Sequence, residues 1–203
     1  MLRGYYFITD EKSSLKGSIS DVCKAMDAGV KVIQYRSKDI STQAMIDEAA
    51  KLREITAKAI FLINDYINVA LAVDADGVHL GQNDISCAEA RELLGVHRKI
   101  GISVSTIEQA KLAQNQGADY LAVSPVFRTT TKSDAGAALG IELIRKIKAE
   151  VSLPIVAIGG ITLENAPEVI AAGADALCAI SAVVSKPDVK KEILKFQKLF
   201  QIL

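Results

Sequence analysis

Four short segments of the chain share one pattern: D-A-G-V-K-V-I-Q at residues 27–34, D-A-D-G-V-H-L-G at 74–81, Q-G-A-D-Y-L-A-V at 116–123 and A-G-A-D-A-L-C-A at 172–179. In each segment a helix end with a small residue or a glycine is followed by a polar turn and a short apolar run. Glycine favours helix termination, and a run that is apolar on both faces is typical of a parallel strand covered by helices. The repeat therefore predicts strands that alternate with helices.

The same alternation extends over the whole chain and predicts eight strands and eight helices. The predicted strands are Tyr5–Thr9, Val32–Arg36, Ile60–Asn64, Gly77–Leu80, Ile100–Val104, Tyr120–Ser124, Ile155–Ile158 and Ala176–Ile180. The predicted helices are Asp21–Ala28, Thr42–Ala59, Tyr66–Val73, Cys87–Leu94, Thr106–Gln116, Ile141–Val151, Leu163–Ala172 and Val189–Phe200. Capping boxes, which place Ser and Glu three residues apart, are predicted at Ser86–Glu89 and Ser105–Glu108.

Eight strand–helix units in 203 residues favour an α/β fold of the (β/α)8 TIM barrel type, as one domain over residues 1–203. The alternative is an open doubly wound sheet, but no G-x-G-x-x-G follows the first predicted strand. No Pro-rich or Ser-rich linker divides the chain.

Charge and composition limit the partners that the sequence predicts. Lys plus Arg equals Asp plus Glu at 24 each, without a basic block, so nucleic acid is not expected as a partner. No apolar run approaches the roughly 20 residues that span a bilayer, and the first residues do not resemble a signal peptide. The three cysteines lack the spacing of a metal site or a disulfide framework, which indicates buried free thiols. We therefore expect a cytoplasmic protein that does not bind membranes. Whether the protein forms a homo-oligomer stays an open question.

Polar residues alternate where the second predicted strand ends. In Q-Y-R-S-K, the period of a strand places Gln34, Arg36 and Lys38 on one side. Active sites of such barrels lie at the carboxyl ends of the strands, and Arg and Lys bind phosphate oxygens there. The alternative is a strand end whose charges are simply solvated.

Carboxylates follow the next two predicted strands. Asn64 and Asp65 end the third strand, and Asp84 follows the fourth. Mg²⁺ is commonly held by one or two carboxylates together with phosphate oxygens, so the pair suggests Mg²⁺ on a phosphorylated ligand. Each residue also has a structural interpretation, Asp65 as a helix N-cap and Asp84 as a loop residue.

The later strands end in groups that suit anions. Gly159 and Gly160 let a ligand approach backbone N–H groups, and loops after the seventh and eighth strands commonly bind phosphate. Other candidates at strand ends are Ser103 and the Thr-Thr-Thr-Lys tail at residues 129–132, which could equally be a structural serine and a polar loop. The two histidines indicate no base, because His79 lies within a strand and His97 in a polar loop. The residues thus predict two anion sites in one barrel mouth.

Taken in order, the motifs Q-Y-R-S-K, L-I-N-D, G-V-H-L-G-Q-N-D, G-I-S-V, P-V-F-R-T-T-T-K, A-I-G-G-I and A-I-S-A-V resemble those of the thiamine phosphate synthase family. The resemblance runs from about residue 4 to residue 185. It implies a transferase that joins 4-amino-2-methyl-5-hydroxymethylpyrimidine diphosphate to a (carboxy)hydroxyethylthiazole phosphate, giving thiamine phosphate and pyrophosphate in a Mg²⁺-assisted dissociative substitution.

The resemblance also implies roles for individual residues. The diphosphate would be bound by Gln34, Arg36, Lys38, Ser103 and Lys132, the pyrimidine or its diphosphate by Asn64, and Mg²⁺ by Asp65 and Asp84. The thiazole phosphate would be bound by Thr129, Thr131 and the backbone of Gly160, Ile180 and Ser181. Among these, Arg36, Lys38, Ser103 and Lys132 would be catalytic, whereas Thr130 should tolerate change. Residues 133–139 would form a lid loop.

Three positions depart from the family pattern. Tyr35 and Ser37 should face helices or solvent, whereas Ser124, in place of a common glycine, should lie near the ligands and affect the fit of the thiazole.

Two alternatives to this activity remain. A thiazole tautomerase of the same superfamily would carry a histidine in the segment at residues 124–126, which here reads S-P-V. A non-catalytic barrel that binds phosphate ligands would not need both anion sites to be complete.

Overall fold

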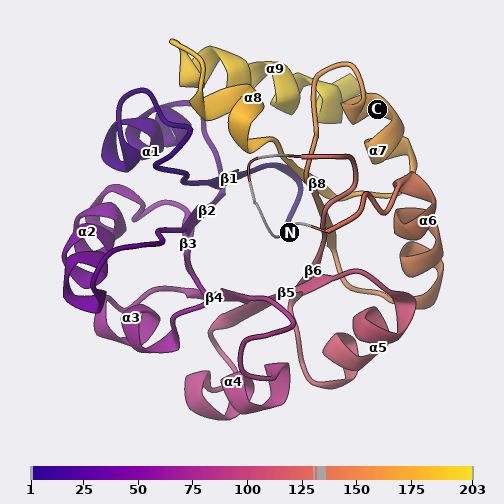
Figure 1. The fold of residues 1–203 in the computed structure, drawn as a ribbon, viewed down its shortest axis with the longest axis horizontal. Helices are drawn as coiled ribbons and strands as arrows, with labels where there is room; N and C mark the ends of the chain where they lie inside the picture. Colours follow the sequence, from indigo (N-terminus) through magenta and orange to yellow (C-terminus); the bar gives the residue numbers. More distant parts are fainter. Residues whose placement is uncertain (1, 130, 132–135, 203) are drawn as a thin grey trace.

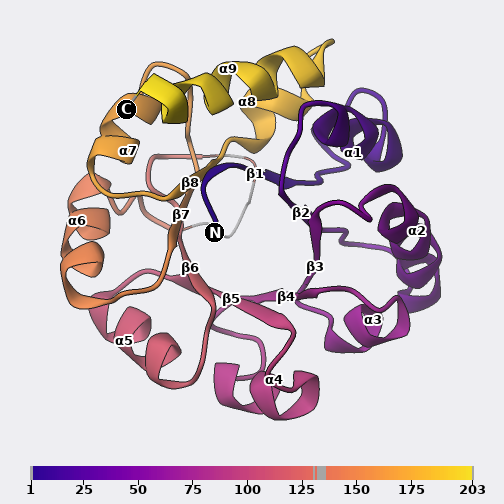
Figure 2. The same ribbon diagram turned by 180° about the vertical axis from the view of Figure 1, so that it is seen from behind.

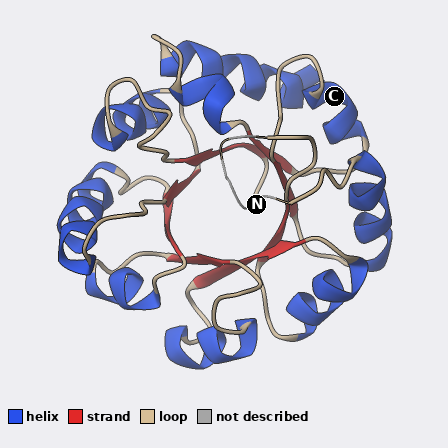
Figure 3. Cartoon of the chain, viewed as in Figure 1, coloured by secondary structure: helices blue, strands red, loops and turns tan. Residues whose placement is uncertain are grey.

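A computed structural model describes residues 2–129, 131 and 136–202 of the chain. Eight parallel strands form a closed barrel in chain order, and helices surround it, which confirms the predicted (β/α)8 fold (Figure 1; Figure 3). The strands are β1 (Gly4–Ile8), β2 (Val32–Tyr35), β3 (Ile60–Asn64), β4 (Gly77–Leu80), β5 (Lys99–Val104), β6 (Tyr120–Val123), β7 (Ile155–Ile158) and β8 (Ala176–Cys178). The helices are α1 (Ser18–Asp27), α2 (Thr42–Ile55), α3 (Ile67–Ala72), α4 (Cys87–Leu94), α5 (Ile107–Asn115), α6 (Ile141–Glu150), α7 (Ala166–Ala171), α8 (Ile180–Val184) and α9 (Val189–Ile202).

The period of two along each strand separates two apolar layers. On β1, Tyr5 and Phe7 belong to the large layer between strands and helices, whereas Tyr6 and Ile8 belong to the barrel interior. The segment that leads into β1 lies across the barrel axis in both ribbon views, and Leu2 packs against the interior residues (Figure 2). Both faces of the strands are therefore buried, as the continuous apolar runs predicted.

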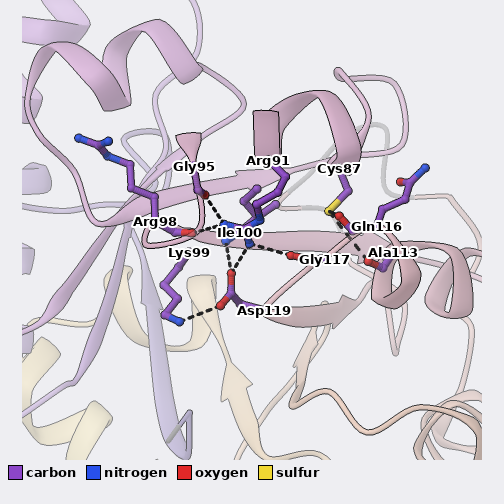
Figure 4. Close-up of polar contacts among 10 residues, drawn as sticks. All are labelled: Cys87, Arg91, Gly95, Arg98, Lys99, Ile100, Ala113, Gln116, Gly117 and Asp119. Atoms are coloured by element: carbon purple, nitrogen blue, oxygen red, sulfur yellow. Dashed lines mark hydrogen bonds and ion pairs between the residues drawn. The ribbon is translucent and has the colours of Figure 1, made fainter. Parts of the chain in front are cut away.

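The polar turn of the sequence repeat has a specific structural task. The aspartate directly before β4, β6 and β8 accepts a hydrogen bond from a backbone N–H near the start of the preceding strand. It also pairs with a cation from the helix before that strand, which is α2, α4 or α6. The sets are Asp76 with Phe61 and Arg53, Asp119 with Ile100 and Arg91, and Asp175 with Ile155 and Lys148. Figure 4 shows the Asp119 set, to which Lys99 adds a second cation. In the segment at residues 27–34 the corresponding position is Lys31.

One of the two predicted capping boxes is wrong in detail. Ser86 and Glu89 form the predicted capping box, but α5 is capped one residue later than predicted, by Thr106 rather than Ser105. Thr106 Oγ1 accepts the N–H of Gln109, and the Gln109 side chain reaches back to accept the N–H of Ser105, one residue before the N-cap. Glutamine and glutamate both suit the third position of a capping box, so the sequence offered two registers.

The predicted eighth strand is too long. β8 ends at Cys178, and residues 180–184 form α8, a short helix that the sequence did not predict. By composition alone, the apolar run C-A-I-S-A-V-V fits a buried strand as well as a buried helix, because both kinds of element are covered on all sides. The predicted helices at residues 42–59 and 163–172 are also shorter, ending at Ile55 and starting at Ala166.

Candidate active site

A cavity opens at the carboxyl ends of the strands, where the sequence predicted the site. Its lining includes eleven of the thirteen predicted residues: Gln34, Arg36, Lys38, Asn64, Asp65, Ser103, Thr129, Thr131, Gly160, Ile180 and Ser181. The lining does not include Asp84, and Lys132 lies outside the described residues. Gln34, Arg36 and Lys38 thus share one side of the chain, as the period of a strand requires.

The end of β1 orients Arg36. Asp10 Oδ2 pairs with the Arg36 guanidinium at 3.1 Å, and Asp10 is buried. Thr9 Oγ1 accepts the N–H of Arg36 at 2.9 Å and donates to its carbonyl at 3.1 Å. A guanidinium has five N–H donors in a planar fork, so the pairing with Asp10 leaves donors for a ligand in the cavity. The sequence reasoning missed Thr9 and Asp10, although polar residues at a strand end were the signal used elsewhere.

The two predicted metal ligands lie in different local settings. Asp65 adopts a left-handed backbone conformation with φ of 63° and lines the cavity. It does not cap α3, whose N-cap is Tyr66, so the N-cap interpretation is wrong. Asp84 Oδ2 accepts the N–H of Gly81 at 2.6 Å, and Gly81 lines the cavity. Asp84 is exposed, and this hydrogen bond joins it to the cavity lining through Gly81.

Backbone groups form the opposite side of the cavity. Gly159 and Gly160 have φ of 95° and 66°, which is the left-handed region that favours glycine. A Cβ on Gly160 would lie 2.6 Å from the carbonyl oxygen of Arg128, so only glycine fits there. Ile180 and Ser181 are the first residues of α8, and first-turn N–H groups have no partner within their own helix. These backbone donors suit a phosphate.

The threonine tail of β6 reaches the same side. Thr129 and Thr131 both line the cavity, and Thr129 Oγ1 accepts the N–H of Thr131 at 3.3 Å. Ser124 also lines the cavity, as its predicted place near the ligands requires. Thr130, Lys132 and residues 133–135 of the predicted lid lie outside the described residues.

Two ionisable groups of the cavity are built for structure rather than proton transfer. Both ring nitrogens of His79 are hydrogen-bonded, to Tyr120 and to Ser103, each at 2.9 Å. Burial raises the pKa of the Cys178 thiol well above its ordinary value, so the thiol stays protonated. The prediction of buried free thiols is confirmed for Cys87 and Cys178, whereas Cys23 is only half-buried. His97 is exposed, as predicted.

Among residues 2–129, 131 and 136–202, no three His, Cys, Asp or Glu side chains gather as a metal cluster. A metal at Asp65 and Asp84 would therefore need further oxygen ligands from water or from a bound phosphate group.

Comparisons with known proteins agree on one family. The family model described as thiamine monophosphate synthase matches residues 5–183. The chain is 51% identical to the thiamine-phosphate synthase of Methanosarcina barkeri over 193 residues, covering 95% of this chain and 88% of that one. It is 45% identical to the thiamine-phosphate synthase of Chloroflexus aurantiacus over 200 residues, covering 97% and 92%. The solved structure of a thiamine phosphate pyrophosphorylase from Pyrococcus furiosus superposes with a TM-score of 0.90 at 40% identity, covering 99% and 96%.

Within the described part of the chain, none of the helices combines the length and the apolar character that crossing a membrane requires.

Proposed function

The chain belongs to the thiamine monophosphate synthase family, and from this premise we propose how its barrel mouth carries out the reaction. The enzyme is a transferase that joins a hydroxymethylpyrimidine diphosphate to a thiazole phosphate, with formation of thiamine phosphate and release of pyrophosphate. The observation that supports the proposal best is that one cavity is lined both by the side-chain cations Arg36 and Lys38 and by the glycine and helix-start backbone at Gly160, Ile180 and Ser181, which could serve as two anion-binding halves.

The cationic half would hold the diphosphate. Arg36 and Lys38 line the cavity, and Asp10 keeps the Arg36 guanidinium in place. Lys132 would add a third cation, and Ser103 and Gln34 would donate hydrogen bonds to the diphosphate. Asn64, at the end of β3, would contact the pyrimidine or its diphosphate. These groups favour loss of pyrophosphate because they neutralise the charge that develops on the leaving group.

The backbone-rich half would hold the thiazole phosphate. The N–H groups near Gly160, Ile180 and Ser181, with the hydroxyls of Thr129 and Thr131, supply donors without a full positive charge. A monophosphate commonly binds after the seventh and eighth strands of such barrels. Binding there would point the thiazole nitrogen toward the pyrimidine.

We propose Mg²⁺ as the cofactor, held by Asp65 and Asp84 with diphosphate oxygens. The donor set fits, because both side chains are hard oxygen donors and two cations of the site can balance the remaining phosphate charge. When bound, Mg²⁺ supplies further neutralisation of the diphosphate.

The bond changes need no strong base. The C–O bond between the pyrimidine CH₂ and the diphosphate breaks and leaves a cation that the electron-rich aminopyrimidine ring stabilises. The lone pair of the thiazole nitrogen then forms the new C–N bond. Neither step removes a proton, so the reaction fits a cavity in which Cys178 stays protonated and both nitrogens of His79 are used in hydrogen bonds. The task of the chain is to bind, orient and neutralise.

We further propose that the enzyme works as a single-domain protein in the cytoplasm, acting on small-molecule substrates. A homo-oligomer is compatible with this proposal, and the oligomeric state can be measured independently by light scattering.

The test is pyrophosphate release by the purified enzyme with Mg²⁺ and both substrates. Release that requires both substrates and Mg²⁺ is expected, and replacing Lys132 with alanine should reduce turnover severely. Isomerisation of the thiazole without pyrophosphate release would instead show a tautomerase. Binding of both ligands by calorimetry without turnover would show a non-catalytic barrel.

A further inference from the structure

Inside the apolar barrel lies a line of polar side chains that the proposed roles leave largely unexplained. Tyr6, Gln34, His79 and Tyr120 are each at most 5% exposed, and they come from β1, β2, β4 and β6. Their neighbours in the barrel interior are aliphatic side chains such as Leu62 and Val156. Polar groups buried among aliphatic side chains destabilise the fold unless they are hydrogen-bonded, so such a line has to be continuous.

The hydrogen bonds of these residues do form one continuous chain. Gln34 Nε2 donates to the Tyr6 hydroxyl at 2.8 Å, and the Tyr6 and Tyr120 hydroxyls lie 2.7 Å apart. The Tyr120 hydroxyl lies 2.9 Å from His79 Nδ1, and His79 Nε2 lies 2.9 Å from Ser103 Oγ. Gln34, His79 and Ser103 line the cavity, whereas Tyr6 and Tyr120 do not. The chain thus starts and ends at the cavity and passes beneath its floor.

Gly101 makes the central link geometrically feasible. In the barrel, Gly101 on β5 lies between His79 on β4 and Tyr120 on β6 in register. A Cβ on Gly101 would lie 1.9 Å from Cζ of Tyr120 and 2.2 Å from its hydroxyl oxygen. The phenol of Tyr120 therefore occupies the space of the missing side chain and crosses β5 to reach His79.

The direction of the chain follows from counting protons. Burial raises the pKa of both Tyr6 and Tyr120, so each hydroxyl keeps its single proton. Either hydroxyl of the Tyr6–Tyr120 pair could donate, but if Tyr120 donated to Tyr6, the Tyr6 proton would have no acceptor among the bonds of this chain. With Gln34 donating to Tyr6, the Tyr6 proton therefore goes to Tyr120, and the Tyr120 proton goes to Nδ1 of His79. Nδ1 must be an unprotonated acceptor, which leaves the ring proton on Nε2, where it is donated to Ser103. The Ser103 hydroxyl proton is then directed to the cavity.

We propose that Tyr6 and Tyr120 are positioning residues that fix the Nε2–H tautomer of His79 and thereby make Ser103 a hydrogen-bond donor toward the diphosphate. This inference rests on the proposed function for the identity of the ligand, but the tautomer itself is a property of the free protein. A serine that donates, rather than accepts, suits an anion. Reversal of the chain would point the Ser103 proton at His79 and present only lone pairs to the diphosphate.

The first test measures the tautomer without substrates. The chain has two histidines, so nitrogen NMR of histidine-labelled protein gives two ring systems, and a His97→Gln variant assigns them. The expected result is a neutral His79 with the proton on Nε2 alone, and loss of this single state in Tyr120→Phe. A proton on Nδ1 of the wild-type protein, or an unchanged tautomer in Tyr120→Phe, would overturn the proposal.

The second test compares kinetics of variants that lose one buried hydroxyl each. Tyr120→Phe and Tyr6→Phe should lower kcat/KM for the pyrimidine diphosphate about tenfold, which corresponds to one hydrogen bond, and leave KM for the thiazole phosphate unchanged. The control is Tyr35→Phe, because Tyr35 is equally buried on β2 but its hydroxyl donates to Glu48 on the helix side. Wild-type kinetics in both Tyr120→Phe and Tyr6→Phe would refute the positioning role. Absence of activity in the wild-type enzyme would instead refute the proposed function and leave the NMR result decisive for the hydrogen-bond chain.

Discussion

Replacing Asp119 with asparagine should destabilise the barrel without changing its chemistry. The Asp119 carboxylate binds the N–H of Ile100 at 2.9 Å, Arg91 at 2.7 Å and Lys99 at 2.7 Å (Figure 4). The side chains of Asp119 and Arg91 are 24% and 20% exposed, whereas Lys99 is 48% exposed. Hydrogen bonds to charged groups contribute roughly 1.5–3 kcal/mol and exposed pairs about 0.2–1 kcal/mol. The partly buried set should therefore lose about 2–3 kcal/mol of unfolding free energy.

The assay is urea unfolding. If the m value, the dependence of unfolding free energy on urea, is the same in both proteins, a shift of the midpoint reports the change in stability. The matched control is Asp74→Asn, because Asp74 also pairs with an arginine at 2.7 Å, Arg98, but its side chain is 85% exposed. That control should lose less than about 1 kcal/mol. Equal losses of unfolding free energy in the two variants would refute the reasoning that burial makes the Asp119 interactions more stabilising.

The dependence on pH has a definite sign. Burial acts to raise the pKa of Asp119, but hydrogen bonds from Lys99, the Ile100 amide and Arg91 outweigh it, and the pKa lies below its ordinary value. The group therefore adds stability above the unfolded pKa of about 3.9, and this contribution is lost as the pH falls through the folded pKa. The gap between wild type and Asp119→Asn should be constant near neutral pH and shrink below about pH 4. Rates of pyrophosphate release should be equal, because Asp119 precedes β6 at the end of the barrel opposite the cavity.

Three further variants test the site. Arg36→Ala should lower kcat/KM for the pyrimidine diphosphate at least about 100-fold, as loss of a preorganised donor does in other enzymes, and near-normal steady-state kinetics would exclude its proposed role. Asp10→Asn should raise KM for the same substrate about tenfold, because Arg36 loses its orienting partner, and an unchanged KM would show that Arg36 orients itself. Gly160→Ala should raise KM for the thiazole phosphate about tenfold or more, since the new methyl group would meet the carbonyl of Arg128. Its control is Gly117→Ala, also at positive φ but remote from the cavity, which should reduce thermal stability and leave both KM values unchanged; parallel KM effects in the two variants would point to general strain.

The architecture was accessible from sequence because its signals are local and repeated. All eight strands lie where apolar runs follow polar turns, and each is paired with its neighbour as the predicted barrel requires. The reason for the repeat was not accessible, because Asp119 acts on Ile100 and Arg91, which lie far away in sequence. The sequence pattern of the repeat predicted a turn, but the aspartate in this turn also anchors the preceding strand.

In the candidate site, too, local features could be predicted from the sequence and long-range contacts could not. Period two placed Gln34, Arg36 and Lys38 correctly on one side, because strand geometry is local. The partners behind them were missed, since Asp10 and Tyr120 reach the site only after the barrel closes. For the same reason the sequence could not decide between the N-cap and cavity positions of Asp65, whose left-handed backbone decides against the cap.

The central claim, that one cavity holds a diphosphate and a monophosphate in separate halves, is tested most directly by a crystal structure with pyrophosphate, Mg²⁺ and thiamine phosphate. The account predicts pyrophosphate on Arg36 and Lys38, with Mg²⁺ between it and the carboxylates of Asp65 and Asp84. It predicts the monophosphate on the backbone N–H groups at Gly160 and Ser181. Pyrophosphate bound away from Arg36, or both anions bound in the same half of the cavity, would contradict it.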